Sequence, residues 1–423
     1  MKVMVVGSGA REHALAARLA RSPGVSGLIC APGNGGTAAI AENLPLKAED
    51  PTAVVELARQ HDVGLVVVGP EVPLVAGVCD ALREAGIDAF GPSAAAARIE
   101  GSKAFSKRFM LKHGIPTAPG AIFDDPDAAA AHVRGAGEPL VVKADGLAAG
   151  KGVIVASTVD ESVEAIDRIM RQRVFGDAGA TVVLEERLVG QEVSYHVVAD
   201  GERFVALAAS QDHKRVGDGD TGPNTGGMGA YSPPPVVTPE VEQRILDRIV
   251  RPSLDGFRAE GIRYTGALFI GLMIVDGDPF VIEYNVRFGD PETQALMARH
   301  QGDVLPLLQG SARGDLSGVK ARWEAPCSMC VVLASEGYPG SYPEGRPITG
   351  IERAETVEGV SVIHAGTRRE GDQLVTSGGR VLSVTAIADD IDAAAERAYA
   401  AVERIHFDGM HYRHDIGWHA RTR

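Results

Sequence analysis

Residues 279–292 read Pro-Phe-Val-Ile-Glu-Tyr-Asn-Val-Arg-Phe-Gly-Asp-Pro-Glu. If the first half is a β-strand, alternation places Glu283, Asn285 and Arg287 together on one face. Carboxylate and amide oxygens are ligands for Mg²⁺, and a guanidinium binds carboxylate or phosphate groups. The pattern therefore favours phosphoryl transfer, although an isolated strand of this kind is more often a half-solvated strand whose polar face meets water. The opposite face would carry the apolar residues Ile282, Tyr284 and Val286.

The residues that follow the arginine favour a functional interpretation. Gly289 ends the strand, and Pro291 keeps Asp290 out of helical geometry. Two further carboxylates, those of Asp290 and Glu292, are thereby held at the end of the strand. We therefore count Asp290 among the candidate catalytic residues.

The composition is that of a globular protein with several domains. With 423 residues and 45% hydrophobic content, the chain is expected to form about three domains. Its net charge of -14 argues against nucleic acid and anionic membranes as partners. Cys327 and Cys330 have the spacing of a zinc pair, but no second pair follows, so reduced core cysteines are expected. No apolar run is long enough for a signal peptide or a membrane span, so the sequence predicts a cytoplasmic protein.

Residues 1 to about 100 alternate apolar runs with helical segments, which predicts a doubly wound parallel sheet. Ligands of such sheets bind at the carboxyl ends of the strands, here residues 7–13, 31–37 and 68–71. Glu12 stands where a dinucleotide fingerprint needs its third glycine, so a sugar phosphate fits better than NAD. The alternative is that these segments are only tight turns. Helices are predicted over residues 12–21, 52–60, 75–85, 105–113, 240–260 and 391–405.

Residues 139–155 predict two strands that flank a loop rich in glycine, alanine and lysine. The loop is not a P-loop, because Gly152 stands where a hydroxyl is required and a strand follows in place of a helix. A glycine loop between antiparallel strands can fold over phosphates, with Lys151 in the loop and Lys143 on the strand below. A plain hairpin would not explain why two of only nine lysines among 42 basic residues lie here.

Three later segments complete the chain. Residues 182–194 predict two strands joined by a connection whose backbone can read an adenine edge, with Glu192 placed to meet ribose hydroxyls. Residues 211–229 form a long polar loop suited to enclosing a substrate, in which His213 is expected to be structural. Residues from about 326 onward predict a β-rich α+β domain, and its tail at 412–417 shows no catalytic spacing.

The sequence resembles the phosphoribosylamine-glycine ligase family of ATP-grasp enzymes. The resemblance runs along the whole chain in order, and Arg-Phe-Gly-Asp-Pro-Glu at 287–292 is its most specific part. It implies an enzyme of purine (IMP) biosynthesis that uses ATP and Mg²⁺ or Mn²⁺ to join glycine to 5-phosphoribosylamine. The products would be glycinamide ribonucleotide, ADP and phosphate, formed through glycyl phosphate by a monomer or weak homodimer. The other matching segments read Glu-Gly-Ser-Lys at 100–103, Val-Lys-Ala-Asp-Gly-Leu-Ala-Ala-Gly-Lys-Gly at 142–152 and Ser-Gln-Asp-His-Lys-Arg at 210–215.

The fold that this resemblance implies is mixed α/β and α+β, arranged as in biotin carboxylase. A doubly wound parallel α/β domain for the sugar substrate would span residues 1–102. An ATP-grasp domain would span residues 103–325, with an inserted lid subdomain at about 123–193. A β-rich α+β domain would follow at residues 326–423.

The resemblance also implies roles for individual residues. ATP would be bound by Lys103, Lys143, Gly146, Gly150, Lys151, Gly152, Glu185, Glu186, Leu188 and Glu192, with the lysines and glycines at the phosphates, residues 185–188 at adenine and Glu192 at ribose. The metal ion would be held by Glu283 and Asn285. Phosphoribosylamine would face Gly9, Asn34, Gly69, Pro70 and Glu71, with Asp212, Lys214 and Arg287 nearer the reacting groups.

Two alternatives remain open. A different ATP-grasp carboxylate-amine ligase would share the ATP residues and differ in the N-terminal turns and in residues 217–229. A non-catalytic nucleotide sensor would bind ATP without turnover, although the set Glu283, Asn285 and Arg287 argues against it. One departure from many ATP-grasp enzymes leaves the number of metal ions open, because residues 267–273 supply no carboxylate on the strand before Glu283.

Overall fold

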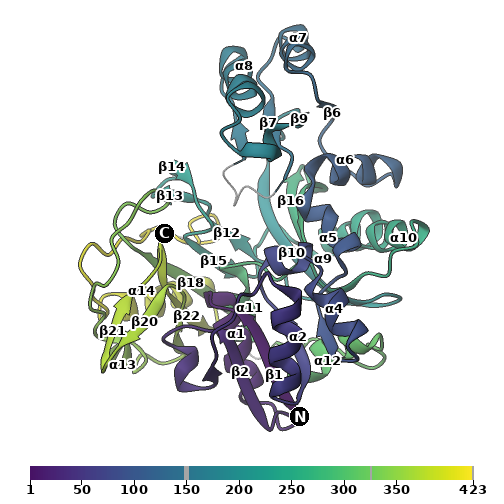
Figure 1. The fold of residues 1–423 in the computed structure, drawn as a ribbon. Helices are drawn as coiled ribbons and strands as arrows, with labels where there is room; N and C mark the ends of the chain where they lie inside the picture. Colours follow the sequence, from purple (N-terminus) through teal and green to yellow (C-terminus); the bar gives the residue numbers. More distant parts are fainter. Residues whose placement is uncertain (147–151, 324–325, 422–423) are drawn as a thin grey trace.

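The computed structural model describes residues 1–146, 152–323 and 326–421. Figure 1 shows the N-terminal part in purple at the base, the C-terminal part in yellow-green beside it, and a lobe carrying β7, α7 and α8 at the opposite end. The long strands β10 and β16 lie between these parts. The predicted parallel N-terminal sheet and β-rich C-terminal part are confirmed. No helix within the three described ranges is long and apolar enough to cross a membrane.

The N-terminal part is a parallel sheet with the strand order β3-β2-β1-β4-β5. Its central strands are apolar runs buried on both faces, as a doubly wound sheet requires. The helix predicted over 75–85 is interrupted, because Gly77 adopts a left-handed φ of 86° between α3 and α4. The elements are β1 Lys2–Gly7, α1 Ala10–Leu19, β2 Gly27–Pro32, a 3-10 turn Thr37–Ala39, β3 Glu42–Asn43, α2 Pro51–Gln60, β4 Val63–Val68, α3 Glu71–Val75, α4 Val78–Glu84, β5 Asp88–Phe90 and α5 Ala94–Gly101.

The projecting lobe is a small antiparallel sheet with the order β6-β9-β7-β8, covered by two helices. Asp125 begins α7 by accepting hydrogen bonds from the N–H groups of Asp127 and Ala128, and Gly137 ends it in a left-handed conformation. The two strands predicted around the glycine-rich loop are β7 and β8. The elements are β6 Gly120–Phe123, α7 Pro126–Ala136, β7 Val141–Ala144, β8 Val153–Val155, α8 Val159–Ile166 with a π-helical turn Asp167–Arg171, a 3-10 turn Gly176–Gly179 and β9 Val182–Glu185.

The central sheet has the order β11-β10-β16-β17, and β17 Asp278–Asn285 is the strand predicted at the start of the motif. Its alternation is broken at one position, because Glu283 pairs with Gly271 while Val281 pairs with Leu272. Ile282 is thus the extra residue of a β-bulge and is only half-buried, which corrects its predicted place on the apolar face. The other elements are α6 Lys103–Lys112, β10 Gln191–Asp200, β11 Phe204–Ala206, α9 Pro239–Ile245, a π-helical turn Leu246–Val250, α10 Arg251–Ala259, β16 Thr265–Val275, α11 Glu292–Arg299 and α12 Leu305–Arg313.

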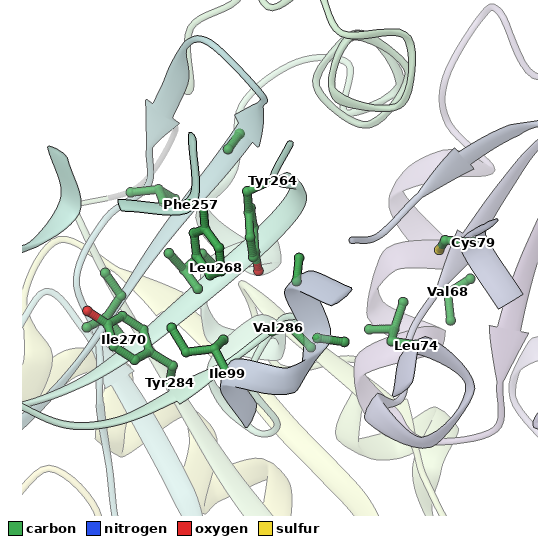
Figure 2. Packing of buried hydrophobic residues seen from close by; sticks show 14 of the residues in the cluster. Val68, Leu74, Cys79, Ile99, Phe257, Tyr264, Leu268, Ile270, Tyr284 and Val286 are labelled. Carbon is green, nitrogen blue, oxygen red and sulfur yellow. The ribbon is translucent and has the colours of Figure 1, made fainter. Parts of the chain in front are cut away.

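The apolar face of β17 packs into the largest core. Tyr284 and Val286 are buried against Ile99 of α5 and Leu268 and Ile270 of β16, as Figure 2 shows. The Tyr284 hydroxyl lies 2.6 Å from Ser253 Oγ, so its buried polar atom has a partner. The same core extends to Val68 and Leu74 of the N-terminal part. One face of β17 is therefore anchored between the two parts, which leaves its polar face fixed in direction.

The C-terminal part is an antiparallel sheet with the order β12-β15-β18-β22-β19, and α14 packs on it. Residues 211–229, which were predicted to form one long loop, begin with β12 and end at the first residue of β15. These strands join the C-terminal sheet through β15 and β18, and a hairpin of β13 and β14 stands between them in the sequence. The elements are β12 Gln211–Asp212, β13 Arg215–Gly217, β14 Thr221–Asn224, β15 Gly229–Ser232, β18 Cys327–Ala334, α13 Ile351–Ala354, β19 Val360–His364, β20 Thr367–Glu370, β21 Gln373–Thr376, β22 Arg380–Ala388 and α14 Ile391–Val402.

Candidate active site

The polar side chains at the end of β17 contact one another in a row. Asn285 Nδ2 lies 3.5 Å from Glu283 Oε1, and Arg287 Nη2 donates to Asn285 Oδ1 at 3.1 Å. The next residues are held from behind, because Gly289 N donates to Nε2 of the buried His196 at 3.1 Å and Phe288 stacks on Phe90. The strand end is therefore rigid, and it presents a carboxylate, an amide and a guanidinium side by side.

Arg287 connects this row to the N-terminal part. Its Nε lies 3.3 Å from Glu71 Oε2 and its Nη2 lies 3.3 Å from Glu100 Oε1. Glu100 also accepts a hydrogen bond from Val286 N at 2.7 Å, and burial raises the pKa of this carboxyl. Burial opposes the charge of Arg287, but the two carboxylates raise the pKa of Arg287 above its usual value. The guanidinium is thus fixed by ion pairs on both sides.

Lys214 lies in a group of carboxylates in front of β17. Its Nζ is 3.4 Å from Glu283 Oε1 and 3.6 Å from Glu192 Oε2. Lys214 lowers the pKa of Glu283 to about 2. Burial raises the pKa of Asp212, Lys214 opposes this, and the nearby carboxylates, that of Glu292 first, add to it, so that the pKa of Asp212 is about 8. Negative charge therefore exceeds positive charge around Asp212.

A second group of charges lies between the projecting lobe and the central part. Glu185 is only 5% exposed and is paired with two lysines, Lys143 Nζ at 2.5 Å and Lys107 Nζ at 2.8 Å. Lys143 Nζ also donates to Ile282 O at 2.9 Å, which is the carbonyl of the β17 bulge. Lys103 Nζ donates to Gly146 O at 3.0 Å at the base of the lobe. The lysines predicted at 103 and 143 thus lie at the junction of the lobe with β17.

The other residues predicted to bind ATP differ in their exposure and in their backbone hydrogen bonds, and two of them are not described by the structure. Glu186 is exposed and its N–H donates to Pro119 O at 2.9 Å, while Leu188 is half-buried. Gly152 O accepts a hydrogen bond from Ala144 N at 2.8 Å. Gly150 and Lys151 lie outside the described residues. Lys107 was not predicted, although it stands one helical turn after Lys103 and is also a lysine in an arginine-rich chain.

A cleft of about 410 Å³ opens between the carboxyl edge of the N-terminal sheet and the C-terminal part. Asn34 spans it, because its Nδ2 donates to Ser8 O and to His364 O, both at 2.9 Å. On the opposite wall, Arg380 Nη2 pairs with Asp290 Oδ2 at 3.2 Å and holds the pKa of Asp290 below its usual value against the effect of burial. The lining residues are Ser8, Gly9, Pro32, Gly33, Asn34, Asp290, Ala365, Gly366, Thr367, Arg368, Ser377 and Arg380.

This cleft brings together only some of the residues predicted to face the sugar substrate. Gly9 and Asn34 line it, together with Asp290. Gly69, Pro70 and Glu71 lie instead at the end of β4, where Glu71 faces Arg287. The lining residues from the C-terminal part were missed, and the Ser-Gly-Gly-Arg run at 377–380 was the signal in the sequence that could have found them.

Three family models match the chain. Residues 1–100 match the phosphoribosylglycinamide synthetase N domain, residues 101–293 its ATP-grasp domain and residues 328–419 its C domain. A phosphoribosylamine-glycine ligase of Vibrio vulnificus is 51% identical over 426 residues, covering 100% of this chain and 99% of the relative. One of Yersinia pestis is 50% identical over 427 residues and covers both chains fully.

Solved structures give the same fold. The phosphoribosylamine-glycine ligase of Thermotoga maritima superposes with a TM-score of 0.87 and 33% identity, covering 99% of this chain and 100% of its own. A biotin carboxylase from Campylobacter jejuni, solved as a complex with βγ-ATP, has a TM-score of 0.73 at 14% identity and covers 97% of this chain and 93% of its own. The expected biotin-carboxylase-like arrangement is therefore confirmed.

Proposed function

The chain belongs to the phosphoribosylglycinamide synthetase family and is an ATP-dependent phosphoribosylamine-glycine ligase of purine biosynthesis, and we propose that the reaction takes place at the carboxyl end of β17. One observation carries the proposal. Glu283 pairs with Lys214, Lys143 of the lobe donates to the carbonyl of the neighbouring Ile282, and Arg287 pairs with Glu71 of the N-terminal part. A nucleotide and an acidic substrate can therefore meet at one place.

We place the ATP phosphates near Lys103 and Lys143, under the segment from Gly146 to Gly152 that includes Gly150 and Lys151. Lys143 supports this placement, because Lys143 and Lys107 share one carboxylate and leave a net positive charge beside β17. The adenine edge would meet the backbone of Glu186 to Leu188, since the side chain of Glu185 is taken up by the two lysines. The ribose would lie toward Glu192, whose side chain is exposed enough to accept hydrogen bonds.

ATP-grasp enzymes use a divalent ion with ATP, and the residues at β17 fit one. Glu283 offers carboxylate oxygens, and the Asn285 side chain beside it carries an amide oxygen, which here accepts from Arg287 Nη2 at 3.1 Å and would turn to the ion. The negative charge around Asp212 would be offset by a cation. No group of three or more His, Cys, Asp or Glu side chains is arranged for a metal in the described ranges. The remaining ligands would then be phosphate oxygens of the nucleotide, and we propose Mg²⁺ or Mn²⁺. Such an ion neutralises charge that develops on the transferred phosphoryl group.

The chemistry needs a leaving group on glycine before an amine can attack its carboxyl carbon. We propose that a glycine carboxylate oxygen attacks the γ-phosphorus, which releases ADP and forms glycyl phosphate. The amine of phosphoribosylamine then attacks the carbonyl carbon, and the carbon–oxygen bond to phosphate breaks. Arg287 orients a carboxylate or phosphate group, and Lys214 neutralises charge beside it. Asp212, with its pKa raised to about 8, is suited to accept the proton that the amine loses.

We propose that phosphoribosylamine occupies the cleft at Gly9, Asn34 and Asp290 and extends toward Glu71 and Arg287. The cleft supports this because one end lies at a helix N-terminus with glycine-rich turns, where backbone N–H groups can approach a phosphate. We also propose the domain boundaries 1–102, 103–325 and 326–423, with the lobe as a lid at about 123–193 and with β12 and β15 reaching from the ATP-grasp domain into the C-terminal sheet. The cytoplasmic location and the monomeric or weakly dimeric state stay predictions.

Isotope transfer tests the proposal. Glycine labelled with heavy oxygen in its carboxylate should deliver one labelled oxygen to inorganic phosphate in each turnover, because that oxygen bonds to phosphorus and later leaves carbon. Mass spectrometry of the phosphate measures this. Label in AMP would show adenylation, and unlabelled phosphate would reject the acyl-phosphate route. Measuring ADP release with a panel of other carboxylates and amines distinguishes this ligase from a related one. Absence of ADP release with every pair of substrates would indicate a nucleotide sensor.

A further inference from the structure

The C-terminal tail, residues 411–417, packs against the loop that carries Lys214. This Lys214 loop comprises residues 213–220 and contains the strand β13. Figure 1 shows the yellow end of the chain passing beside β12 and β13. The tail is far from this loop in sequence, since Gly417 and His213 are separated by 204 positions. Its sequence, Tyr-Arg-His-Asp-Ile-Gly at 412–417, has no catalytic spacing. The role of the tail must therefore be inferred from the residues that it contacts.

The chain on both sides of Lys214 is hydrogen-bonded to this tail, through the His213 side chain before it and through backbone carbonyls after it. The residue before Lys214 and the two after it each have a tail partner, so the lysine stands in the middle of a clamped segment. Its own carbonyl accepts hydrogen bonds from the N–H and the hydroxyl of Thr225, at 2.7 and 2.8 Å. The tail contacts are Gly417 N to His213 Nε2 at 3.2 Å, Arg413 Nη1 to Arg215 O at 3.1 Å, and His411 Nε2 to Val216 O at 2.9 Å.

Arg413 is the centre of the clamp. Its side chain is fully buried, and its Nε and Nη2 form a two-point pair with Asp415 at 2.7 and 2.8 Å. Its Nη1 also binds Asp220 at 2.7 Å, at the tip of the Lys214 loop. Asp415 in turn accepts from Gly219 N at 2.8 Å. Only a planar guanidinium can bind two carboxylates and a carbonyl in this way.

The lysine needs such support because its own ion pairs do not fix it. Lys214 Nζ is 3.4 Å from Glu283 and 3.6 Å from Glu192, which are long contacts for an ammonium group on a flexible stem. The position of its backbone therefore decides where the charge lies. We propose that the C-terminal tail is a positioning element of the ligase, in which Arg413 and Asp415 hold the Lys214 loop so that the ammonium group of Lys214 stays beside Glu283.

This inference rests on the role proposed above for Lys214, and a double-mutant cycle in the full-length enzyme tests both. Arg413→Lys keeps the charge but cannot make the fork, so kcat should fall about 10- to 100-fold, as expected when a reacting group is displaced. KM for ATP should change less than about twofold, because the clamp lies away from the lysines of the lobe. In a Lys214→Met background the same change should lower kcat less than about twofold, since the positioned group is already gone.

Two further variants serve as an alternative to Arg413→Lys and as a control. Asp220→Asn removes one of the two carboxylates that pair with Arg413. Asp220 has a φ of 54°, a conformation that Asn also tolerates, so the backbone should not change. This variant replaces Arg413→Lys in the double-mutant cycle if Arg413→Lys does not fold. Arg397→Lys is the matched control, because the hydrogen bonds and the ion pair of Arg397 go to Ile387 and Glu358 of the same C-terminal part and not to the Lys214 loop. It should leave kcat within about twofold of the wild type in both backgrounds.

Hydrogen exchange separates the clamp from the role of Lys214. Peptides that cover residues 213–224 should exchange faster in Arg413→Lys and in Asp220→Asn than in the wild type, and at the wild-type rate in Arg397→Lys. Unchanged exchange would overturn the clamp. An equal loss of kcat with and without Lys214 would overturn its connection to catalysis. If Lys214→Met alone kept the wild-type kcat, the proposed role of Lys214 would fail, and the exchange rates would still decide whether the tail holds the loop.

Discussion

Replacing Lys143 with methionine removes a charge from the group between the lobe and β17 while keeping the length of the side chain. In the wild type, Lys107 and Lys143 share the carboxylate of Glu185, so this buried group carries one surplus positive charge. Without Lys143, Glu185 keeps its 2.8 Å pair with Lys107, and no buried charge loses its last partner. The fold should therefore survive the change. What disappears is the surplus charge, which we place at the ATP phosphates.

The size of the effect follows from the hydrogen bond that is lost. A hydrogen bond to a charged group in a partly buried site contributes about 1.5–3 kcal/mol. Since about 1.4 kcal/mol corresponds to a factor of ten, the dissociation constant of a non-hydrolysable ATP analogue should rise about 10- to 150-fold. Isothermal titration calorimetry of Lys143→Met measures this directly. Lys107→Met should also weaken binding, because Lys143 alone would then neutralise Glu185 and no surplus charge would remain.

The control is Lys112→Met, which removes a lysine from the same part of the chain. Lys112 is paired with Glu260 at 3.0 Å, but its side chain is 64% exposed, so its ion pair contributes less than about 1 kcal/mol. The dissociation constant of the analogue should change less than about twofold. Equal effects of Lys112→Met and Lys143→Met would refute the reasoning, and so would wild-type binding by Lys143→Met.

Four other substitutions test the remaining assignments. Glu283→Gln and Asn285→Leu should each lower kcat by roughly two or more orders of magnitude with an unchanged circular dichroism spectrum, and near-normal turnover in either would reject the metal assignment. Gly9→Val should raise KM for phosphoribosylamine with little change in ATP affinity, because a Cβ at Gly9 would lie 2.7 Å from Glu12 Oε2, and selective loss of ATP affinity would contradict this. Asp212 has a raised pKa of about 8, so the folded protein keeps a proton that the unfolded chain loses above about pH 4, and stability falls as the pH rises between these values. Asp212→Asn should therefore raise the melting temperature at pH 7 to 8 in metal-free buffer while lowering activity, and an unchanged or lower melting temperature would show that the carboxyl ionises normally.

The sequence was enough to predict the regular parts of the site because their signals are local. A period of two identifies the polar face of β17, and the glycine and proline that follow mark where the strand ends. The parallel sheet is visible because its strands are uninterrupted apolar runs between helices. The β-bulge at Ile282 was not predictable, since it depends on how β17 pairs with β16.

The contacts between distant segments could not be predicted in the same way. Lys107 and Glu185 are 78 positions apart, and their pairing exists only because α6 packs against the lobe. Asn34 and His364 are 330 positions apart, and their hydrogen bond helps to form the cleft that the sequence placed on the N-terminal part alone. No pattern of composition or spacing predicts these contacts, because they depend on how separately folded parts of the chain pack against one another.

The polar residues at and after the end of β17 contact different parts of the molecule. Glu283 faces Lys214, whose loop is bonded to the C-terminal tail, and Arg287 pairs with Glu71 and Glu100 at the N-terminal part. Asp290, three residues later, pairs with Arg380 of the C-terminal sheet. Because one rigid segment makes all these ion pairs, a shift of any part alters the same few side chains. The run that determines where the parts meet is therefore also the run where ATP, glycine and the sugar amine are expected to react.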